Sequence, residues 1–94
     1  MNESSINAAS RPAIGRRYRL QWESAQNAHV LLYPEGMIKL NASAGEIIKR
    51  CNGEATIAEI TADLESAYST TGLSGEVMAF VVLAVKNQWL VMLP

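Results

Sequence analysis

The sequence predicts a small α+β domain in which a three-stranded antiparallel sheet is followed by three helices. Two patterns support this fold class. Apolar and polar residues alternate through much of residues 17–41, whereas apolar residues recur every three or four positions from residue 43 onward. The 94 residues suffice for one core, and their 49 % hydrophobic content is that of a globular chain. We therefore expect one compact domain.

The first dozen residues show no apolar period, which is typical of a mobile terminus. We therefore divide the chain into a flexible tail at residues 1–15 and a single domain at residues 16–94. The tail lacks the basic stretch and apolar run of a signal peptide, and the longest apolar run, residues 77–85, is too short to span a bilayer. These features predict a soluble, cytoplasmic protein with no membrane partner.

The first predicted strand covers residues 17–23. Tyr18, Leu20 and Trp22 alternate there with charged or amide side chains and should form its buried face. After a polar turn, residues 28–33 are apolar and rich in branched side chains, as in a central strand of a sheet.

A hairpin should connect this central strand to a third strand. Pro34 and Gly36 favour a three-residue turn, because proline fits the first turn position and glycine tolerates a positive φ. The chain returns at residues 37–41, with Ile38 and Leu40 on one face. In a meander of three consecutive strands, the third strand has a free edge.

Two short amphipathic helices are expected next. Ser43 with Glu46, and Thr56 with Glu59, each match the capping box of a helix start, and Asn-Gly at residues 52–53 separates the two. Apolar residues at helical spacing follow each start: Ala44, Ile47, Ile48 and Cys51 in the first helix, and Ile57, Ile60, Leu64 and Tyr68 in the second. The short turn between them predicts a helix-turn-helix pair.

A third helix is expected from Ser74 to about Gln88, with Glu76 in its favourable first turn. Its residues 77–85 are all apolar, so one face can pack on the core while another stays uncovered. Such a face suits either a contact between two copies of the chain or a binding groove.

The residues that carry chemistry are too few for an enzyme. His29, Cys51 and Asp63 are the single histidine, cysteine and aspartate, and they show no motif spacing. A lone Cys51 at a helical apolar position is typical of a buried core thiol. No cluster of cysteine and histidine supplies the ligands of a metal site. We therefore expect no catalysis, no metal and no cofactor.

Nucleic acid is a possible partner of any helix-turn-helix, but the charges disfavour it here. A helix that enters the major groove needs basic or amide side chains, whereas residues 56–68 carry Glu59, Asp63 and Glu65 and no lysine or arginine. The net charge is −1. The basic run Arg11, Arg16, Arg17 and Arg19 is the remaining argument for nucleic acid, but such a run is more often a solvated strand edge or a site for an acidic peptide.

A strand with a free edge beside a helix with a surplus apolar face predicts a peptide-binding site. An extended peptide can add to such an edge through main-chain hydrogen bonds while its alternate side chains pack against the helix. The same edge and helix could instead pair two copies of this chain, so a purely structural homodimer stays open as an alternative.

The stretch YRLQWESAQNAHVLLYPEGMIKLN, followed by SAGEIIKRCNGEATIAEI, resembles the PqqD family, which are small proteins of pyrroloquinoline quinone (PQQ) biosynthesis. The similarity runs from about Arg16 to Leu93, and RLQWE, HVLLYPEGM and KLN are its most specific segments. The later CNG…T…EI pattern also suits the wider group of recognition elements for ribosomally synthesised, post-translationally modified peptides (RiPPs), which share a winged helix-turn-helix-like fold.

The resemblance implies a peptide chaperone that is not an enzyme. It would bind the precursor peptide PqqA and present it to PqqE, the radical S-adenosylmethionine (SAM) enzyme that joins a glutamate and a tyrosine side chain of that peptide.

In this family the peptide lies along the third strand and against the third helix. Carried over to this chain, the peptide-binding residues are Met37, Ile38, Lys39 and Leu40 on the strand and Met78, Val81, Val82 and Val85 on helix 74–88. An alternative helix stripe is Val77, Phe80, Val81 and Ala84. A nucleic-acid-binding winged helix and a recognition domain for another leader peptide remain the competing hypotheses.

Overall fold

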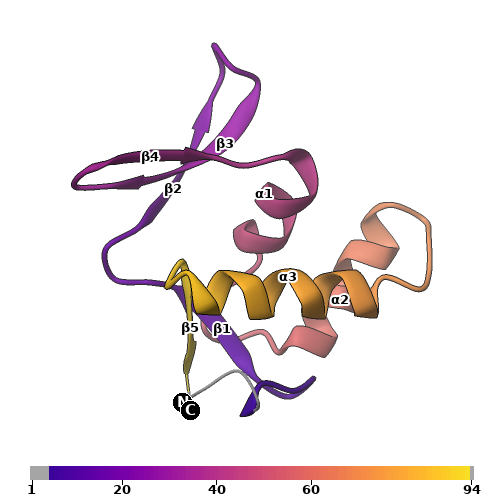
Figure 1. Cartoon of the computed structure of the whole chain (residues 1–94). Coiled ribbons are helices and arrows are strands. Elements are labelled where there is room, and N and C mark those ends of the chain that lie inside the picture. The colour runs from indigo at the N-terminus through magenta and orange to yellow at the C-terminus, as the bar shows by residue number, and fades with distance from the viewer. Residues whose placement is uncertain (1–4, 94) are drawn as a thin grey trace.

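The structure, a computed structural model, describes residues 5–93, which form two antiparallel sheets and three helices (Figure 1). In chain order the elements are β1 (Arg11–Ile14), β2 (Arg19–Glu23), β3 (Ala28–Tyr33), β4 (Gly36–Lys39), α1 (Ala42–Lys49), α2 (Ile57–Ala67), α3 (Ser74–Lys86) and β5 (Leu90–Leu93). The predicted α+β class, with a three-stranded meander before three helices, is confirmed. The sheet of β1 and β5 was not predicted.

The three-stranded sheet has the order β2-β3-β4, with β3 in the centre. Val30 and Leu31 of β3 are fully buried, as expected for the central strand. Tyr33 pairs with Gly36, so the hairpin turn contains two residues instead of the predicted three. Trp22 was expected to be buried, but it is 51 % exposed. Its ring instead lies edge-on against His29 of β3, at a centroid distance of 4.9 Å.

The small sheet joins the two ends of the described chain. β1 pairs antiparallel with β5, from Arg11 opposite Leu93 to Ile14 opposite Leu90. The prediction of a flexible tail up to residue 15 is therefore wrong for β1, whereas residues 1–4 lie outside the described residues. The segment just before β1 also docks, because the carbonyl oxygens of residues 8 and 10 accept hydrogen bonds from the first N–H groups of α2. These oxygens satisfy donors that the helix itself leaves without partners.

The helix starts follow local hydrogen-bonding rules. Thr56 and Glu59 form the predicted capping box of α2, since each side chain accepts a hydrogen bond from the other residue's backbone N–H. The first helix begins earlier than predicted. Asn41, not Ser43, is its N-cap, and the Asn41 side chain accepts a hydrogen bond from the N–H of Ala44.

The core lies where α1, α2 and α3 meet β3 and β5. Leu31, Ile48, Ile60 and Leu90 from four different elements are almost fully buried there. Figure 1 shows α3 crossing the middle of the molecule, with the three-stranded sheet and α1 on one side of it and the small sheet near its yellow end. No helix within residues 5–93 is long and apolar enough to cross a membrane.

Candidate functional site

His29, Cys51 and Asp63, the residues considered for possible catalysis, each make contacts with other parts of the fold. The Cys51 thiol is buried and donates to the carbonyl oxygen of Ile47 at 3.2 Å, and burial raises its pKa to about 12. A thiol with so high a pKa carries almost no thiolate at neutral pH. His29 packs on Gly45 of α1 and on Trp22. Among the described residues, no group of three histidine, cysteine or carboxylate side chains could hold a metal ion.

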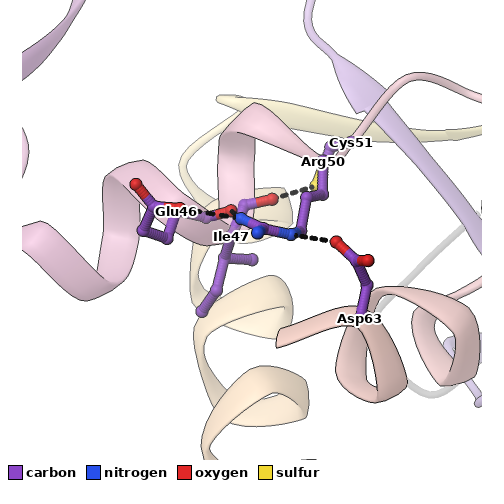
Figure 2. A network of polar contacts seen from close by, with 5 residues as sticks. All are labelled: Glu46, Ile47, Arg50, Cys51 and Asp63. Carbon is purple, nitrogen blue, oxygen red and sulfur yellow. Dashed lines mark hydrogen bonds and ion pairs between the residues drawn. The ribbon is translucent and has the colours of Figure 1, made fainter. Parts of the chain in front are cut away.

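Asp63 belongs to an ion-pair network that joins α1 to α2 (Figure 2). The Arg50 guanidinium donates from Nε to Asp63 at 2.6 Å and from an Nη atom to Glu46 at 2.8 Å. The hydrogen bond from Arg50 lowers the pKa of the Glu46 carboxyl below its ordinary value, against an opposing effect of burial. The network therefore holds two helices of the domain together.

The edge of β4 offers backbone groups for a further strand. Neither β2 nor β4 pairs with a further strand among residues 5–93. The Leu40 N–H donates to the His29 carbonyl at 3.0 Å, which makes this a hydrogen-bonded pair of the β3–β4 ladder. Such pairs alternate in an antiparallel ladder. The N–H and C=O groups of Met37 and Lys39 consequently point to the free edge.

The predicted strand residues divide between the surface and the core. The side chains of Met37, which is 52 % exposed, and Lys39 are open to solvent. Ile38 is half-buried and Leu40 is only 5 % exposed, within the core cluster. The side chain of Leu40 is therefore not available to a ligand, although the strand's backbone is.

The helix residues predicted to bind the peptide also divide between the core and the partly exposed surface. Val81 has no exposed surface and belongs to the core with Val77 and Ala84, so these three side chains face inward. Met78, Val82 and Val85, spaced for one helix face, are half-buried on one flank of this inward stripe. The opposite flank carries Glu76, Phe80 and Leu83, again at helical spacing, with Leu83 49 % exposed.

Two hollows show what lies beside the flanks of α3. The first, of about 260 Å³, is lined by Ala42 and Ser43, the first two residues of α1, together with Leu73 and Glu76 at the start of α3. Val85, on the other flank, lines a different hollow together with β5. Glu76 therefore lies beside the start of α1, whereas Val85, on the flank predicted from the sequence, lies beside β5.

β4 and α3 run in opposite directions. In Figure 1 the β3–β4 turn and the yellow end of α3 lie on the same side of the molecule, whereas α1 and the orange start of α3 lie on the other. The hollows agree with this view. Arg16, Arg17 and Tyr18 line one hollow with the end of α3 and another with the β3–β4 turn. An extended chain that pairs with β4 and continues past both of its ends would thus run between the side of the yellow end of α3 and the side of its orange start.

This fold, which has an unpaired strand edge and a partly exposed apolar helix, is winged helix-turn-helix-like. Its arrangement matches the solution NMR structure of the PqqD truncation of Methylobacterium extorquens PqqCD, described as a functional, stand-alone RiPP recognition element. The TM-score is 0.79 over 97 % of this chain and 99 % of that one, at 22 % sequence identity, which shows a shared fold.

The chain belongs to the PqqD family, since the model for coenzyme PQQ synthesis protein D matches residues 28–90. It is 44 % identical to the PqqA binding protein of Stutzerimonas stutzeri over 93 % of this chain and 96 % of that protein. It is also 42 % identical to the PqqA binding protein of Azotobacter vinelandii, over 96 % of this chain and 97 % of the relative. The family predicted from the sequence is confirmed.

Proposed function

We propose that this chain binds the precursor peptide PqqA as an added strand on the free edge of β4 and presents it to the radical SAM enzyme PqqE during PQQ biosynthesis. The observation that carries the proposal is the near-full-length similarity to relatives named PqqA binding protein. The outward backbone groups of Met37 and Lys39 supply the physical means, because an edge strand with free donors and acceptors is a template for another strand.

The helical side of the proposed site is the flank of Phe80 and Leu83. A strand has side chains on both faces, so alternate side chains of a peptide added to β4 could reach α3, and Leu83 offers exposed apolar surface on that helix. Lys39 and Met37 border the same edge from the strand side. Ile38 contributes only partly, and Leu40 and Val81 act by holding the strand and the helix in place from the core.

Hydrogen exchange tests strand addition residue by residue. The amides of Met37 and Lys39 should become protected when PqqA of Stutzerimonas stutzeri is added, because they gain partners across the new ladder. The amide of Leu40 already donates to His29 and should change little. If exchange slowed equally at Leu40 and at Met37 and Lys39, or at none of the three, strand addition at this edge would be contradicted.

A pair of glutamate substitutions tests the helical flank. Leu83→Glu places a charge in the proposed contact, whereas Leu93→Glu places the same charge on β5 at a similar exposure, 42 % against 49 %. We expect Leu83→Glu to weaken PqqA binding about tenfold or more, and Leu93→Glu to leave it within about twofold. Equal effects of the two substitutions would remove α3 from the site.

Presentation to PqqE is tested by the rate at which PqqE cross-links PqqA with and without this protein. The Leu83→Glu variant should lose the acceleration because it no longer holds the peptide. An unchanged rate in the presence of the wild-type protein would limit the function to peptide binding. A shuffled leader peptide serves as the control for specificity toward PqqA.

The competing hypotheses predict different observations. Duplex DNA has little to bind on α2, whose exposed side chains include Glu59 and Asp63 and whose residues include no lysine or arginine. A homodimer through the β4 edge would compete with the peptide. Light scattering over a dilution series, with and without PqqA, would then show dissociation of the dimer as the peptide binds.

A further inference from the structure

A hollow of about 570 Å³ lies at the end of α3, between β5 and the segment that connects β1 to β2; we call it the basic hollow. Three cationic residues line it, namely Arg16, Arg17 and Lys86, and no carboxylate is among its described lining residues. Tyr18 and Val85 add apolar surface. The hollow thus combines positive charge with surface that can pack against methylene groups.

The charges of the basic hollow are only partly neutralised within the protein. Arg17 forms a double hydrogen bond with Glu35 at 2.6 and 2.7 Å, and both side chains are largely exposed. Arg16 and Lys86 have no ion pair or side-chain hydrogen bond within residues 5–93. Two cations at the rim are therefore free to pair with a ligand.

The helix end itself does not cancel this positive charge. Carbonyl oxygens at a helix C-terminus carry partial negative charge when they have no partner. Here the carbonyl oxygens of Leu83, Ala84 and Val85 accept hydrogen bonds from backbone N–H groups of residues 87–89. The basic character of the hollow persists beside the end of α3.

The opposite end of α3 is acidic. The hollow of about 260 Å³ there, which we call the acidic hollow, is lined by Glu46 and Glu76 and by no lysine or arginine among its described residues. Glu65 lies close by and accepts a hydrogen bond from the N–H of Leu73. Because Arg50 pairs with Glu46, Glu76 is the lining carboxylate with no ion pair within residues 5–93, and the sign of the unpaired charge differs between the two ends of α3.

We propose that the basic hollow receives an acidic segment of the peptide bound along β4 and α3, and that the contrast with the acidic hollow fixes the direction of that peptide. The inference rests on the proposed function. A strand can pair with an edge in either direction through nearly equivalent hydrogen bonds. Opposite charges at the two ends of α3 make one direction attractive and the other repulsive.

The test uses a double charge reversal and a matched single reversal elsewhere. Arg16→Glu combined with Lys86→Glu inverts the basic hollow, whereas Lys49→Glu inverts an exposed cation that lines neither hollow. Calorimetry measures binding of Stutzerimonas stutzeri PqqA and of the same peptide with its acidic residues changed to amides. Each titration is made at about 50 mM and about 500 mM salt, where screening differs strongly.

The double variant should bind PqqA about tenfold or more weakly at low salt, and the difference should shrink at high salt. Lys49→Glu should bind within about twofold of wild type, and the amide peptide should not distinguish the proteins.

Equal binding of PqqA by wild type and the double variant would overturn the charge proposal alone. Failure of the wild-type protein to bind PqqA at all would overturn the proposed function as well. Wild-type binding of a short DNA duplex that the double variant loses would assign the basic hollow to nucleic acid and overturn the proposal.

Discussion

Replacing Gly45 with alanine should destabilise this protein, against the usual effect of that change inside a helix. Gly45 is buried within α1, and alanine in a helix interior is normally favoured over glycine by about 1 kcal/mol. Here an added Cβ would lie 2.8 Å from Nδ1 of His29 and 3.1 Å from its Cβ. Turning the imidazole relieves only the first contact, because the His29 Cβ is fixed to the backbone of β3.

Overpacking of this kind costs about 1–3 kcal/mol, so the net destabilisation of Gly45→Ala should be about 1 kcal/mol. For a domain of this size that free energy corresponds to a fall of about 4–8 °C in melting temperature. Gly75→Ala in α3 is the matched control, since nothing lies within 4 Å of its added Cβ. It should leave the melting temperature unchanged or raise it.

A double-mutant cycle identifies the cause. In a His29→Ala background the contact with Nδ1 at 2.8 Å is gone but the contact with Cβ at 3.1 Å remains, so Gly45→Ala should cost less stability there than in the wild-type background. Thermal denaturation followed by circular dichroism gives all four stabilities. An equal loss from Gly45→Ala in both backgrounds, or a gain in the wild-type background, would refute the proposed packing of α1 on β3.

Three further outcomes follow from burial and charge. Val81→Asp should prevent folding, because Val81 is fully buried, whereas Val82→Asp should fold; circular dichroism separates the two. Cys51 should resist alkylation by iodoacetamide in the native protein and react readily in urea, since burial raises its pKa to about 12. The lowered pKa of Glu46 means that its pairing with Arg50 stabilises the fold above pH 4.5 and is lost as the pH falls through the folded-state pKa. The stability difference between wild type and Glu46→Gln should therefore be larger at neutral pH than in acid, as measured by urea denaturation.

Elements set by local interactions could be predicted from the sequence. The capping box of Thr56 and Glu59 needs only four consecutive residues, and β3 is marked by its own apolar run. The pairing of β1 with β5 has no such signal, because it joins opposite ends of the chain and each strand has four residues. Trp22 looked buried because alternation reveals a face of a strand but not whether another layer covers that face.

The candidate site could be predicted from the sequence only in part: its strand edge could be predicted, but its helix face could not. A third strand with a free edge follows from the order of the meander, and β4 has that edge. The face of α3 does not follow from periodicity, since residues 77–85 are apolar on every side. Only the packing of the helix separates the buried stripe through Val81 from the flank of Leu83. Glu76, seven residues before Leu83 on the same flank, is the one polar marker that the sequence contained.

The size of β4 limits what strand addition alone can contribute. Met37 and Lys39 together offer four outward backbone groups, and four net hydrogen bonds contribute about 2–6 kcal/mol. Association costs about 4–15 kcal/mol in lost freedom, so these bonds do not hold a peptide by themselves. In the proposed complex, the flank of Leu83 and the charges of Arg16 and Lys86 are the features that we expect to supply the remainder. Substitutions at those positions should therefore weaken peptide binding more than substitution of any side chain on β4, where the contribution comes from the backbone.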